Sequence, residues 1–420
     1  MWCRFFFGGF VLIPIFLIVL VDVFGLTLVL PLQAIYAEHL GATPLQATLL
    51  VSVFAVCQLF AGPLLGAFSD RIGRKKVLLF SQLGGVLGYL TMALAPSLWF
   101  VYLARVIQGV TAGNLSIAQA YIADHSKAEH RSQAFAVIGV AFGLGFFVGP
   151  AVTGVLVKHG LSAPIFLAAA MSLLSFFCTV WLLPHTPPTQ TPIETALPGG
   201  RRLSVFEWRN YRPYWDRPVL RAMLGQFLFY ALCFTVFTSG FSLYAERRYV
   251  YDGHPFSPRE IGYLFAYSGF VGLILQGGLM GRLVRHVGER RLVSLGYLSL
   301  CAGFVILAMT GSLFWLGVST TVAALGNAVL RPTLSSLISQ SADPTEQGTV
   351  IGLTQSLQSL AQIVTPIVVG LFLQHGWLWQ WGTLAAGAAA VGWLLAPWGS
   401  WRASSASQAP KNAADRPAQK

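Results

Sequence analysis

The chain has 420 residues, of which 55% are hydrophobic and only 10% charged, and its mean hydropathy is +0.65. Soluble domains usually carry about 25% charged residues, so this composition excludes a large soluble protein and predicts a polytopic membrane protein. The net charge of +12 does not indicate nucleic-acid binding, because the Lys and Arg residues stand in short loops between apolar runs. The five cysteines show no Cys-x-x-Cys spacing, and we interpret them as packing residues.

Twelve apolar runs have the length of about 20 residues that a spanning helix needs. The first contains Asp22 and is too long for a cleaved signal peptide, so we interpret it as a spanning helix. In chain order, the predicted spans are 8–32, 47–69, 77–95, 99–122, 132–157, 162–184, 219–244, 260–283, 292–310, 313–338, 347–373 and 377–399.

The runs divide into two sets of six. Residues 185–218, rich in Pro, Thr and Arg, are predicted to form a linker loop between an N-terminal half (1–184) and a C-terminal half (219–399). Residues 400–420, rich in Ala, Ser, Lys and Pro, are predicted to be a disordered tail.

An internal repeat relates the two halves. The segment 62–76 returns 215 residues later as 277–291, and in each copy a Gly near the end of an apolar run is followed seven residues on by a second Gly and a basic cluster. Further pairs at similar offsets are Gly113-Asn114 with Gly326-Asn327, and Pro150, Gly154 and His159-Gly160 with Pro366, Gly370 and His375-Gly376. Such repeats are typical of secondary transporters whose halves move around a central site. The sequence therefore predicts an all-α membrane protein with twelve transmembrane helices in two pseudo-symmetric six-helix halves.

The basic residues predict the orientation. If the N-terminus is cytoplasmic, 21 Lys and Arg residues fall on that side and 4 on the other, while Arg105 and Arg331 lie within the membrane. Because cytoplasmic loops are enriched in Lys and Arg, both termini and the 185–218 loop are predicted to be cytoplasmic.

Four motifs resemble those of one transporter family. They are Gly66-Ala-Phe-Ser-Asp70-Arg71-Ile-Gly73-Arg74-Lys75-Lys76, Arg105-Val-Ile-Gln-Gly109, Gly145-Phe-Phe-Val-Gly149-Pro150-Ala-Val-Thr-Gly154, and Asp22-Val-Phe-Gly25 with Pro31 and Ala120-Tyr-Ile-Ala-Asp124. The first two resemble motifs of the major facilitator superfamily, and the third resembles the motif of its drug/proton antiporter branches. The last, with its two segments, resembles the tetracycline-resistance efflux proteins in particular. The resemblance implies proton-coupled transport of a small molecule by a monomer in the bacterial inner membrane.

The first motif is predicted to form a cytoplasmic gate. Gly66 should let its helix approach a neighbour closely, and Asp70 suits a helix N-terminus or an Arg across the interface between the halves. The resemblance implies that Asp70 latches this gate in the outward-facing state. The second copy has Arg285 at this position, so the two latches are not equivalent. Plain topology explains the four bases Arg71, Arg74, Lys75 and Lys76 equally well.

The third motif places Gly145, Gly149 and Gly154 on nearly one face of the fifth span, with Pro150 bending the helix. We expect tight packing against a neighbouring helix, and the resemblance implies that the bend also prevents leak during exchange. Thr153 stands where the family pattern usually has another Gly, which departs from the antiporter motif.

Asp22 is the one acid deep in any predicted span, and intramembrane ionisable residues are functional candidates by default. Arg105 lies at a comparable depth, so the two are expected to pair directly or through water. Movement of the pair would change the proton occupancy of Asp22. A static buried ion pair is the alternative.

The candidate substrate cavity draws on both halves. Arg331 is a candidate for binding an anionic group, for pairing with an acid in another state, or for snorkelling towards the cytoplasm. The seventh span carries an aromatic stripe that serves either as cavity wall or as packing and lipid contact. The candidates are Phe227, Tyr230, Phe234, Arg331, Asn114 and Asn327, and Phe237 continues the stripe.

Other chemistries lack signatures. There is no Gly-x-x-x-x-Gly-Lys-Ser/Thr loop for ATP, no metal-ligand cluster, no nucleophile elbow and no cofactor fingerprint. We therefore expect no catalytic residue, metal, cofactor or nucleic-acid partner, and no enzyme activity.

The resulting hypothesis is a proton-coupled exporter of small apolar or drug-like molecules. The alternatives are a proton-coupled importer of a metabolite and a transport-dead receptor or scaffold, which would not need to keep Asp22 and Arg105 in the membrane. The tetracycline exporters resemble one another in having acids within the third and ninth spans, where this chain has Gly88 and Leu300. Tetracycline is therefore expected to be a poor substrate and neutral or weakly anionic compounds better ones.

Overall fold

The computed structural model describes residues 12–125, 131–184, 212–342 and 347–396. Most of the predicted linker loop and the predicted tail, 400–420, lie outside the described residues. So does Cys3, whereas the other four cysteines are free thiols.

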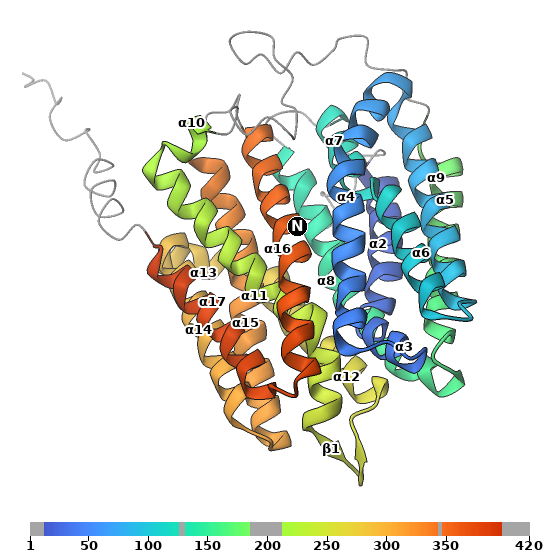
Figure 1. Ribbon diagram of the computed structural model, residues 1–420. Helices are drawn as coiled ribbons and strands as arrows, with labels where there is room; N and C mark the ends of the chain where they lie inside the picture. Colours follow the sequence, from blue (N-terminus) through green and yellow to red (C-terminus); the bar gives the residue numbers. More distant parts are fainter. Residues whose placement is uncertain (1–11, 126–130, 185–211, 343–346, 397–420) are drawn as a thin grey trace, which may run out of the picture.

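In its described residues, the N-terminal half consists of helices and their connections (Figure 1, blue to green). Its elements are α2 (Leu12–Val29), α3 (Gln33–His39), α4 (Pro44–Ile72), α5 (Arg74–Ala93), α6 (Leu98–Val110), α7 (Asn114–His125), α8 (Arg131–Leu156), the 3-10 turn η2 (Val157–His159) and α9 (Ala163–Leu182).

The C-terminal half repeats this plan with one small hairpin added. Its elements are α10 (Arg212–Trp215), α11 (Pro218–Arg248), β1 (Val250–Tyr251), β2 (His254–Pro255), α12 (Pro258–Ile274), the π-helical turn η4 (Leu275–Leu279), α13 (Met280–Val287), α14 (Glu289–Met309), α15 (Leu313–Gln340), α16 (Gln347–Gln374) and α17 (Leu378–Leu394). The strands pair antiparallel, with Val250 opposite Pro255.

The helices have the length and hydropathy of membrane spans. Within the described residues, nine helices are long and apolar enough to cross a membrane, and α2 with α3 forms a tenth span bent by 43°. The other two predicted spans are present as a pair of short helices, α6 and α7, and as the 17-residue α17. The predicted all-α membrane architecture is confirmed.

The structure differs from the predicted spans at two places. The first predicted span, 8–32, is followed by the short helix α3, which the sequence did not predict, and the chain bends between α2 and α3, where Pro31 lacks the N–H that a continuous helix would use. The fourth is interrupted at residues 111–113 between α6 and α7. Both breaks lie in the N-terminal half and face the cavity described below.

The outer surface of the bundle is apolar. Large side chains such as Phe60, Leu64, Trp99, Trp181 and Phe314 are exposed by half or more of their surface. An apolar surface this extensive would be an interaction site or an aggregation hazard in a soluble protein. In a bundle of membrane-spanning helices this apolar surface faces the lipid. The backbone polar groups do not oppose this, because each helix satisfies them internally.

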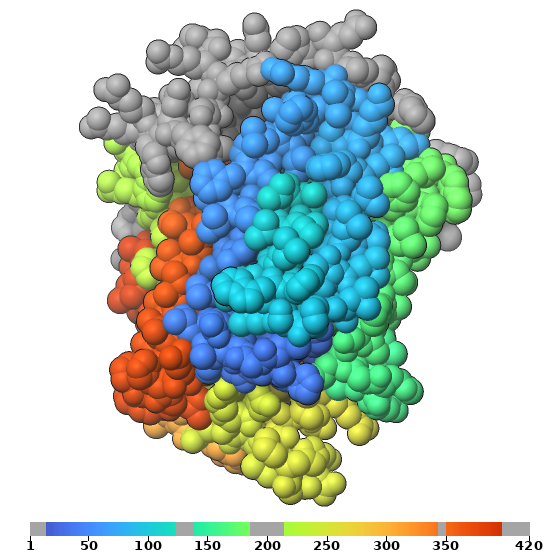
Figure 2. Space-filling view, turned by 45° about the vertical axis from the view of Figure 1, so that its right-hand side comes forward, coloured from blue at the N-terminus to red at the C-terminus, as the bar shows by residue number. Residues whose placement is uncertain are grey.

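The two halves meet through two pairs of helices, α4 with α16 and α8 with α12. The repeat relates these two pairs. In each pair, the second span of one half packs on the fifth span of the other. Figure 2 shows the first of these contacts, where the orange segment of the C-terminal half lies against the blue segments of the N-terminal half.

The repeated glycines end helices in both halves. Gly73 (φ 99°) separates α4 from α5 and Gly288 (φ 83°) separates α13 from α14. Positive φ is costly for residues with a Cβ atom, which explains why the second Gly of the repeated motif is kept in an otherwise degraded copy.

The bundle has two ends, which we name by the features that they carry. The motif end carries Asp70, Arg71 and Arg74, and the hairpin end carries β1, β2 and α3 (top and bottom of Figure 1).

Candidate functional site

A cavity of about 1320 Å³ lies between the two halves. Its walls are formed by helices α2 to α9 of the N-terminal half and by α11, α15 and α16 of the C-terminal half. Ligand pockets typically measure about 300–1,000 Å³, so this cavity has room for a drug-sized molecule and its water.

The cavity opens at the motif end. Its lining continues along α4 through Gly62 and Gly66 to the exposed residues Asp70 and Arg71, and along α16 to Ile351. Beyond the cavity, on the side of the hairpin end, the halves are joined by hydrogen bonds. Thr48 donates to the carbonyl of Pro366 (2.8 Å), Ser52 to that of Ile363 (2.8 Å), and Ser242 to that of Pro31 (2.8 Å).

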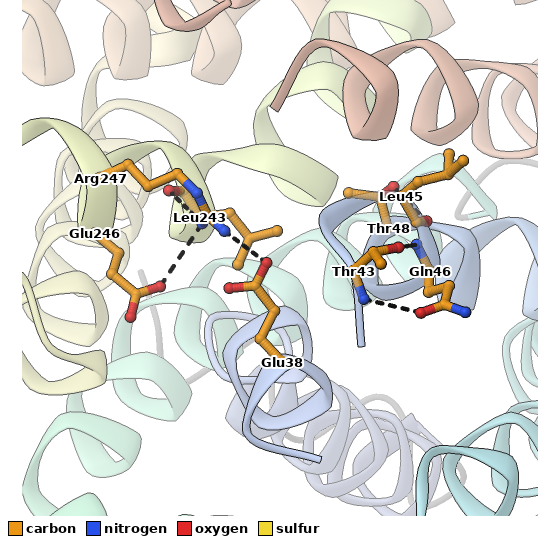
Figure 3. A network of polar contacts seen from close by, with 8 residues as sticks. All are labelled: Glu38, Thr43, Leu45, Gln46, Thr48, Leu243, Glu246 and Arg247. Atoms are coloured by element: carbon orange, nitrogen blue, oxygen red, sulfur yellow. Dashed lines mark hydrogen bonds and ion pairs between the residues drawn. The ribbon is translucent and has the colours of Figure 1, made fainter. Parts of the chain in front are cut away.

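An ion pair also bridges the halves at the hairpin end (Figure 3). Arg247 at the end of α11 donates from Nη2 to Oε1 of Glu38 on α3 at 2.7 Å, and Glu246 lies 3.9 Å from the same guanidinium. The neighbouring start of α4 is fixed by a capping box between Thr43 and Gln46. We call the pair of Glu38 and Arg247 the hairpin-end latch.

Asp22 faces the cavity from α2 and interacts with neutral groups. The side chains of Ser175, Gln82 and Asn114 lie within interaction range of its carboxyl group. Gln82 Nε2 donates to Ser175 Oγ at 2.7 Å, and both residues are fully buried. Helices α5, α7 and α9 thus supply a polar pocket around one carboxyl group.

Arg105 forms no direct ion pair with Asp22 within the described residues. Of the two expected pairings, direct or through water, the direct one is therefore absent in this state. Nη1 of Arg105 donates to Gln108 Oε1 at 2.8 Å and its Nη2 to Gln33 Oε1. Gln33 reaches the guanidinium because the bend at Pro31 redirects α3. Nε of Arg105 is buried and has no hydrogen-bond partner in the described part of the chain.

Tyr89 is a cavity residue near both charged groups that the sequence analysis missed. It projects from α5 into the cavity and lies within electrostatic range of both Asp22 and Arg105. Nothing in the sequence distinguishes this tyrosine from the others in apolar spans, because its significance depends on which way α5 faces.

Gly88, one residue before Tyr89, leaves the space on α5 that the side chain of Gln108 occupies. A Cβ atom at position 88 would lie 2.3 Å from Cγ of Gln108, so any side chain there would displace the residue that holds Arg105. Leu300, the other position that departs from the tetracycline exporters, is buried in the core of the C-terminal half. Neither position presents a charge to the cavity.

A polar stripe on α16 was also missed. Gln355, Gln358 and Gln362 face the cavity at helical spacing, together with Ser356 and Ser359. The signal was available in the sequence, since glutamines at i, i+3 and i+7 in an apolar span lie on one helix face. Four glutamines of the N-terminal half, Gln33, Gln58, Gln108 and Gln119, also line the cavity.

The predicted substrate residues divide into two groups. Tyr230, Phe234, Arg331 and Asn114 line the cavity. Phe227 is 6% exposed and packs in the core, and Asn327 lies behind Tyr230 and accepts a hydrogen bond from its hydroxyl at 2.8 Å. These two are therefore corrected from wall to supporting positions. The α11 stripe is wide enough to face both cavity and core, and Asn327 on α15 is separated from the cavity by Tyr230. Phe237 packs among Phe241, Phe265 and Phe304.

The motif that is predicted to form a cytoplasmic gate lies at the open end of the cavity. Asp70 is exposed and pairs with Arg74 of its own half at 2.5 Å. Gly66 has no atom within 4 Å of its missing Cβ, so the close approach predicted there is absent while the cavity is open at this end.

The four bases of this motif have different environments. Arg71 lines the mouth of the cavity, and Lys76 is exposed. Arg74 is buried beside Ser69, to which its Nη1 donates at 2.6 Å. Lys75 donates from Nζ to the carbonyls of Val180 (2.8 Å) and Leu183 (2.6 Å), so it satisfies the C-terminal end of α9.

The third motif packs in two directions, which corrects the prediction of one common face. The missing side chains of Gly145 and Gly149 would clash with Val23 and Thr27 of α2 in the same half. That of Gly154 points across the interface to α12, where a Cβ would lie 2.9 Å from the carbonyl oxygen of Arg259. The helix is continuous through Pro150.

Thr153 explains the departure from the family pattern. Its hydroxyl donates to the carbonyl of Leu28 on α2 at 2.6 Å, and the side chain is fully buried. Hydrogen bonds between helices are a common form of packing in membranes, so Thr153 strengthens the same helix contact that a glycine would only permit.

The described residues contain no group of three or more His, Cys, Asp or Glu side chains that could hold a metal ion. The charged groups of the cavity are two carboxylates, Asp22 and Asp70, and four guanidinium groups, Arg71, Arg74, Arg105 and Arg331.

The chain is similar to a known family, to resistance proteins of bacteria and to a solved transporter structure. The family model of the Major Facilitator Superfamily matches residues 15–277 and 249–420. The tetracycline resistance protein, class E, of Escherichia coli is 29% identical over 371 residues, which cover 86% of this chain and 89% of that protein. Multidrug resistance protein 2 of Bacillus subtilis (strain 168) is 27% identical over 366 residues, covering 85% and 88%. The crystal structure of the human organic anion transporter MFSD10 (TETRAN) has a TM-score of 0.69 at 26% identity, covering 92% of this chain and 98% of that one.

Proposed function

Because the chain belongs to the Major Facilitator Superfamily, we propose that it is a proton-coupled exporter of small, largely apolar molecules that works by alternating access. The observation that carries this proposal is the cavity, which lies between the halves, contains Asp22, and is continuous with one end of the bundle but separated from the other by hydrogen bonds between the halves. A carrier that alternates between two openings requires such a one-sided cavity.

The basic residues support the orientation. With both termini cytoplasmic, the motif end faces the cytoplasm and the structure represents an inward-open state. In that state a cytoplasmic substrate reaches the cavity past Asp70 and Arg71.

Asp22 is the proposed proton-binding group. Its neighbours Ser175, Gln82 and Asn114 are neutral, so they stabilise either protonation state by rotating donors or acceptors towards the carboxyl group. Arg105 is held nearby by two glutamines rather than by an acid. Rearrangement of the helices could therefore bring it nearer to Asp22 or farther away, which would favour release or uptake of the proton.

The cavity suits neutral and weakly anionic substrates. Four guanidinium groups against two carboxylates favour an anion over a cation, and the glutamine stripe of α16 offers donors and acceptors to uncharged polar groups. The similarity to a tetracycline resistance protein, a multidrug resistance protein and an organic anion transporter supports drug-like organic molecules as the substrate class.

Reconstitution into proteoliposomes tests the proposal. Vesicles with an imposed proton gradient should accumulate a drug-like compound against its own gradient, in the direction opposite to proton flow, and dissipating the proton gradient should abolish this accumulation. Accumulation in the same direction as proton flow would instead identify an importer. A protein that binds ligands but transports none with or without the gradient would be a receptor or scaffold.

A further inference from the structure

Arg331 is the one charged residue that the described part of the C-terminal half contributes to the cavity. It projects from α15 and its side chain is exposed. Within the described residues it forms no ion pair and donates no hydrogen bond to a protein group. A guanidinium group inside a membrane protein is stable only when water, protein or ligand satisfies its charge.

The other charged groups deep in the cavity are already engaged. Arg105 donates to Gln33 and Gln108, and Asp22 interacts with polar neighbours on three helices. At the mouth, Asp70 and Arg74 pair with each other. Arg331 is therefore the deep cation whose donors remain free for a ligand among the described residues.

The surroundings of Arg331 combine this charge with an aromatic wall. Its guanidinium carbon lies 5.3 Å from the centre of the Phe142 ring, which belongs to α8 of the other half. Tyr230 of α11 lies within electrostatic range of Arg331, and its ring stacks on Phe234 with centroids 6.1 Å apart. The Tyr230 hydroxyl is oriented by its bond to Asn327.

A guanidinium group that lies over an aromatic ring keeps its N–H groups at its edge, where they can bind a carboxylate with two parallel hydrogen bonds. Aromatic side chains beside it provide a surface for an apolar body. This pairing of groups fits a molecule with one acidic group and a flat apolar part.

We propose that Arg331 binds the carboxylate of an amphipathic organic anion whose apolar body lies along Phe142, Tyr230 and Phe234. This inference rests on the proposed function for the cavity as a substrate site, and it names the chemical group and the residue that recognise each other. Because Phe142 and Arg331 come from different halves, the bound anion contacts both parts that move during transport.

The experiment compares an acid with its neutral ester. The full-length protein, in nanodiscs without any proton gradient, is titrated with 2-naphthylacetate and with its methyl ester, and binding is followed by equilibrium dialysis of both compounds. The variants are Arg331→Gln, Arg331→Lys and, as the matched control for loss of one exposed positive charge in the same half, Arg282→Gln. Arg282 lies on α13 and does not line the cavity.

Wild-type protein should bind the acid more tightly than the ester. Arg331→Gln should weaken acid binding by about 10-fold or more, as expected for the loss of a charge-assisted hydrogen bond, and should leave ester binding within about 2-fold, since that compound has no charge to lose. Arg331→Lys should recover part of the difference, and Arg282→Gln should behave as wild type. Equal thermal unfolding midpoints of the variants would show that each is folded.

Three outcomes would overturn the proposal. One is equal weakening of acid and ester by Arg331→Gln, which would assign Arg331 a purely structural role. Another is acid binding that does not change in this variant, and the third is wild-type protein that prefers the ester or binds neither compound. Proton-driven accumulation is measured separately, so the loss of transport with retained discrimination would reject the proposed function and keep the anion site.

Discussion

At the scale of single residues, the cavity separates two roles that one ion pair was expected to combine. Asp22 sits among neutral hydrogen-bonding groups, and Arg105 is held by amides on α3 and α6. Charged groups that are not locked to each other can change partners when the helices move. Proton binding and charge compensation are therefore free to occur at different steps of a transport cycle.

Asp22→Asn should abolish proton-driven accumulation and leave the protein folded, because the amide fills the same space but cannot bind and release a proton. Uphill transport in proteoliposomes measures the effect, and downhill exchange is expected to survive. Asp252→Asn is the matched control, since Asp252 lies in the exposed hairpin at φ 50°, a conformation that Asn tolerates. Uphill transport by Asp22→Asn at the wild-type rate would show that Asp22 is not the coupling group.

Arg105→Ala should also abolish uphill transport. The substitution leaves Gln33 and Gln108 without the guanidinium group that both now bind, and it removes the cation nearest to Tyr89 in the described cavity. Replacing a buried cation in this way typically costs about 3–5 kcal/mol when its partner is left uncompensated, but here the partners are neutral amides. We therefore expect the variant to fold, as its elution from a sizing column would show, and yet to fail in transport.

Gly88→Asp should lower the thermal unfolding midpoint, because the new side chain would clash with Gln108. Overpacking of this kind costs about 1–3 kcal/mol. The double variant Gly88→Asp with Gln108→Ala should recover much of the lost stability, since removal of the glutamine side chain makes room for the carboxylate. If the single variant were as stable as wild type, the steric explanation for the missing acid would be wrong.

At the scale of elements, α3 is a short connector between the cavity and the closed end. Its first residue, Gln33, accepts a hydrogen bond from Arg105, and Glu38 near its other end forms the hairpin-end latch with Arg247. A helix of seven residues is too short to bend between these points. Displacement of Arg105 by a substrate or proton would therefore be transmitted to the latch by rigid movement of α3.

Charge exchange tests the hairpin-end latch itself. Glu38→Arg or Arg247→Glu alone should loosen the hairpin end, and the double exchange should restore it. A partly exposed ion pair contributes only about 0–1 kcal/mol, so we expect a change of a few-fold. The measurement is the rate at which Thr238→Cys, which lines the cavity, reacts with an impermeant thiol reagent added from the hairpin side, in a chain without its native cysteines. Failure of the double exchange to restore the slow rate would count against an ion-pair latch.

The elements show what the sequence could and could not predict. The long apolar spans and the repeated glycines predicted the helices and the turns at Gly73 and Gly288, because hydrophobicity and backbone conformation are local properties. The break near Gly113 was missed, since apolar composition continues across it, and so was the short helix α3 after the predicted end of the first span. The direction in which each helix faces was also beyond prediction, and this is why Tyr89 escaped notice while Phe227 and Asn327 were placed on the cavity wall. The α16 glutamines could have been found from their spacing.

At the scale of the whole molecule, the repeat in the sequence predicted the architecture, and its two copies now occupy equivalent places. α4 packs on α16 and α8 on α12, so each half contributes the same pair of helices to the interface. The copies differ in the polar groups that they bring to the cavity: Asp22 and Arg105 lie in the N-terminal half, and Arg331 and the glutamine stripe lie in the C-terminal half. The first half is thus proposed to handle protons and the second the substrate.

The proposed topology can be checked by labelling. In intact cells, an impermeant thiol reagent should modify Asp252→Cys in the hairpin and fail to modify Ser204→Cys in the predicted cytoplasmic loop, which lies outside the described residues. Permeabilised cells should allow both to react, which controls for accessibility of the site itself. Reaction of Ser204→Cys in sealed cells would overturn the orientation and, with it, the inward-open assignment.

Tetracycline should be at best a poor substrate. The cavity has one deep carboxylate and two deep arginines, and Gly88 and Leu300 bring no further acid, so a positively charged metal–drug chelate would be repelled. Cells that express the chain should gain less resistance to tetracycline than to neutral or weakly anionic compounds of similar size. Strong tetracycline resistance that disappears with Asp22→Asn would refute this inference.

The open space beside four glycines has a consequence for energetics. Gly62 and Gly66 on α4, and their repeat partners Gly277 and Gly281, have no atom within 4 Å of a missing side chain. Substitution by Ala at these positions should therefore leave the free energy of the state seen here almost unchanged and raise only that of a conformation in which the motif end is closed. Each such variant would destabilise the closed conformation relative to the open one. A difference of about 1.4 kcal/mol would lower the ratio of closed to open protein about tenfold. The population of the closed conformation in each variant, relative to wild type, would measure how tightly that position packs on closure without any ligand being bound.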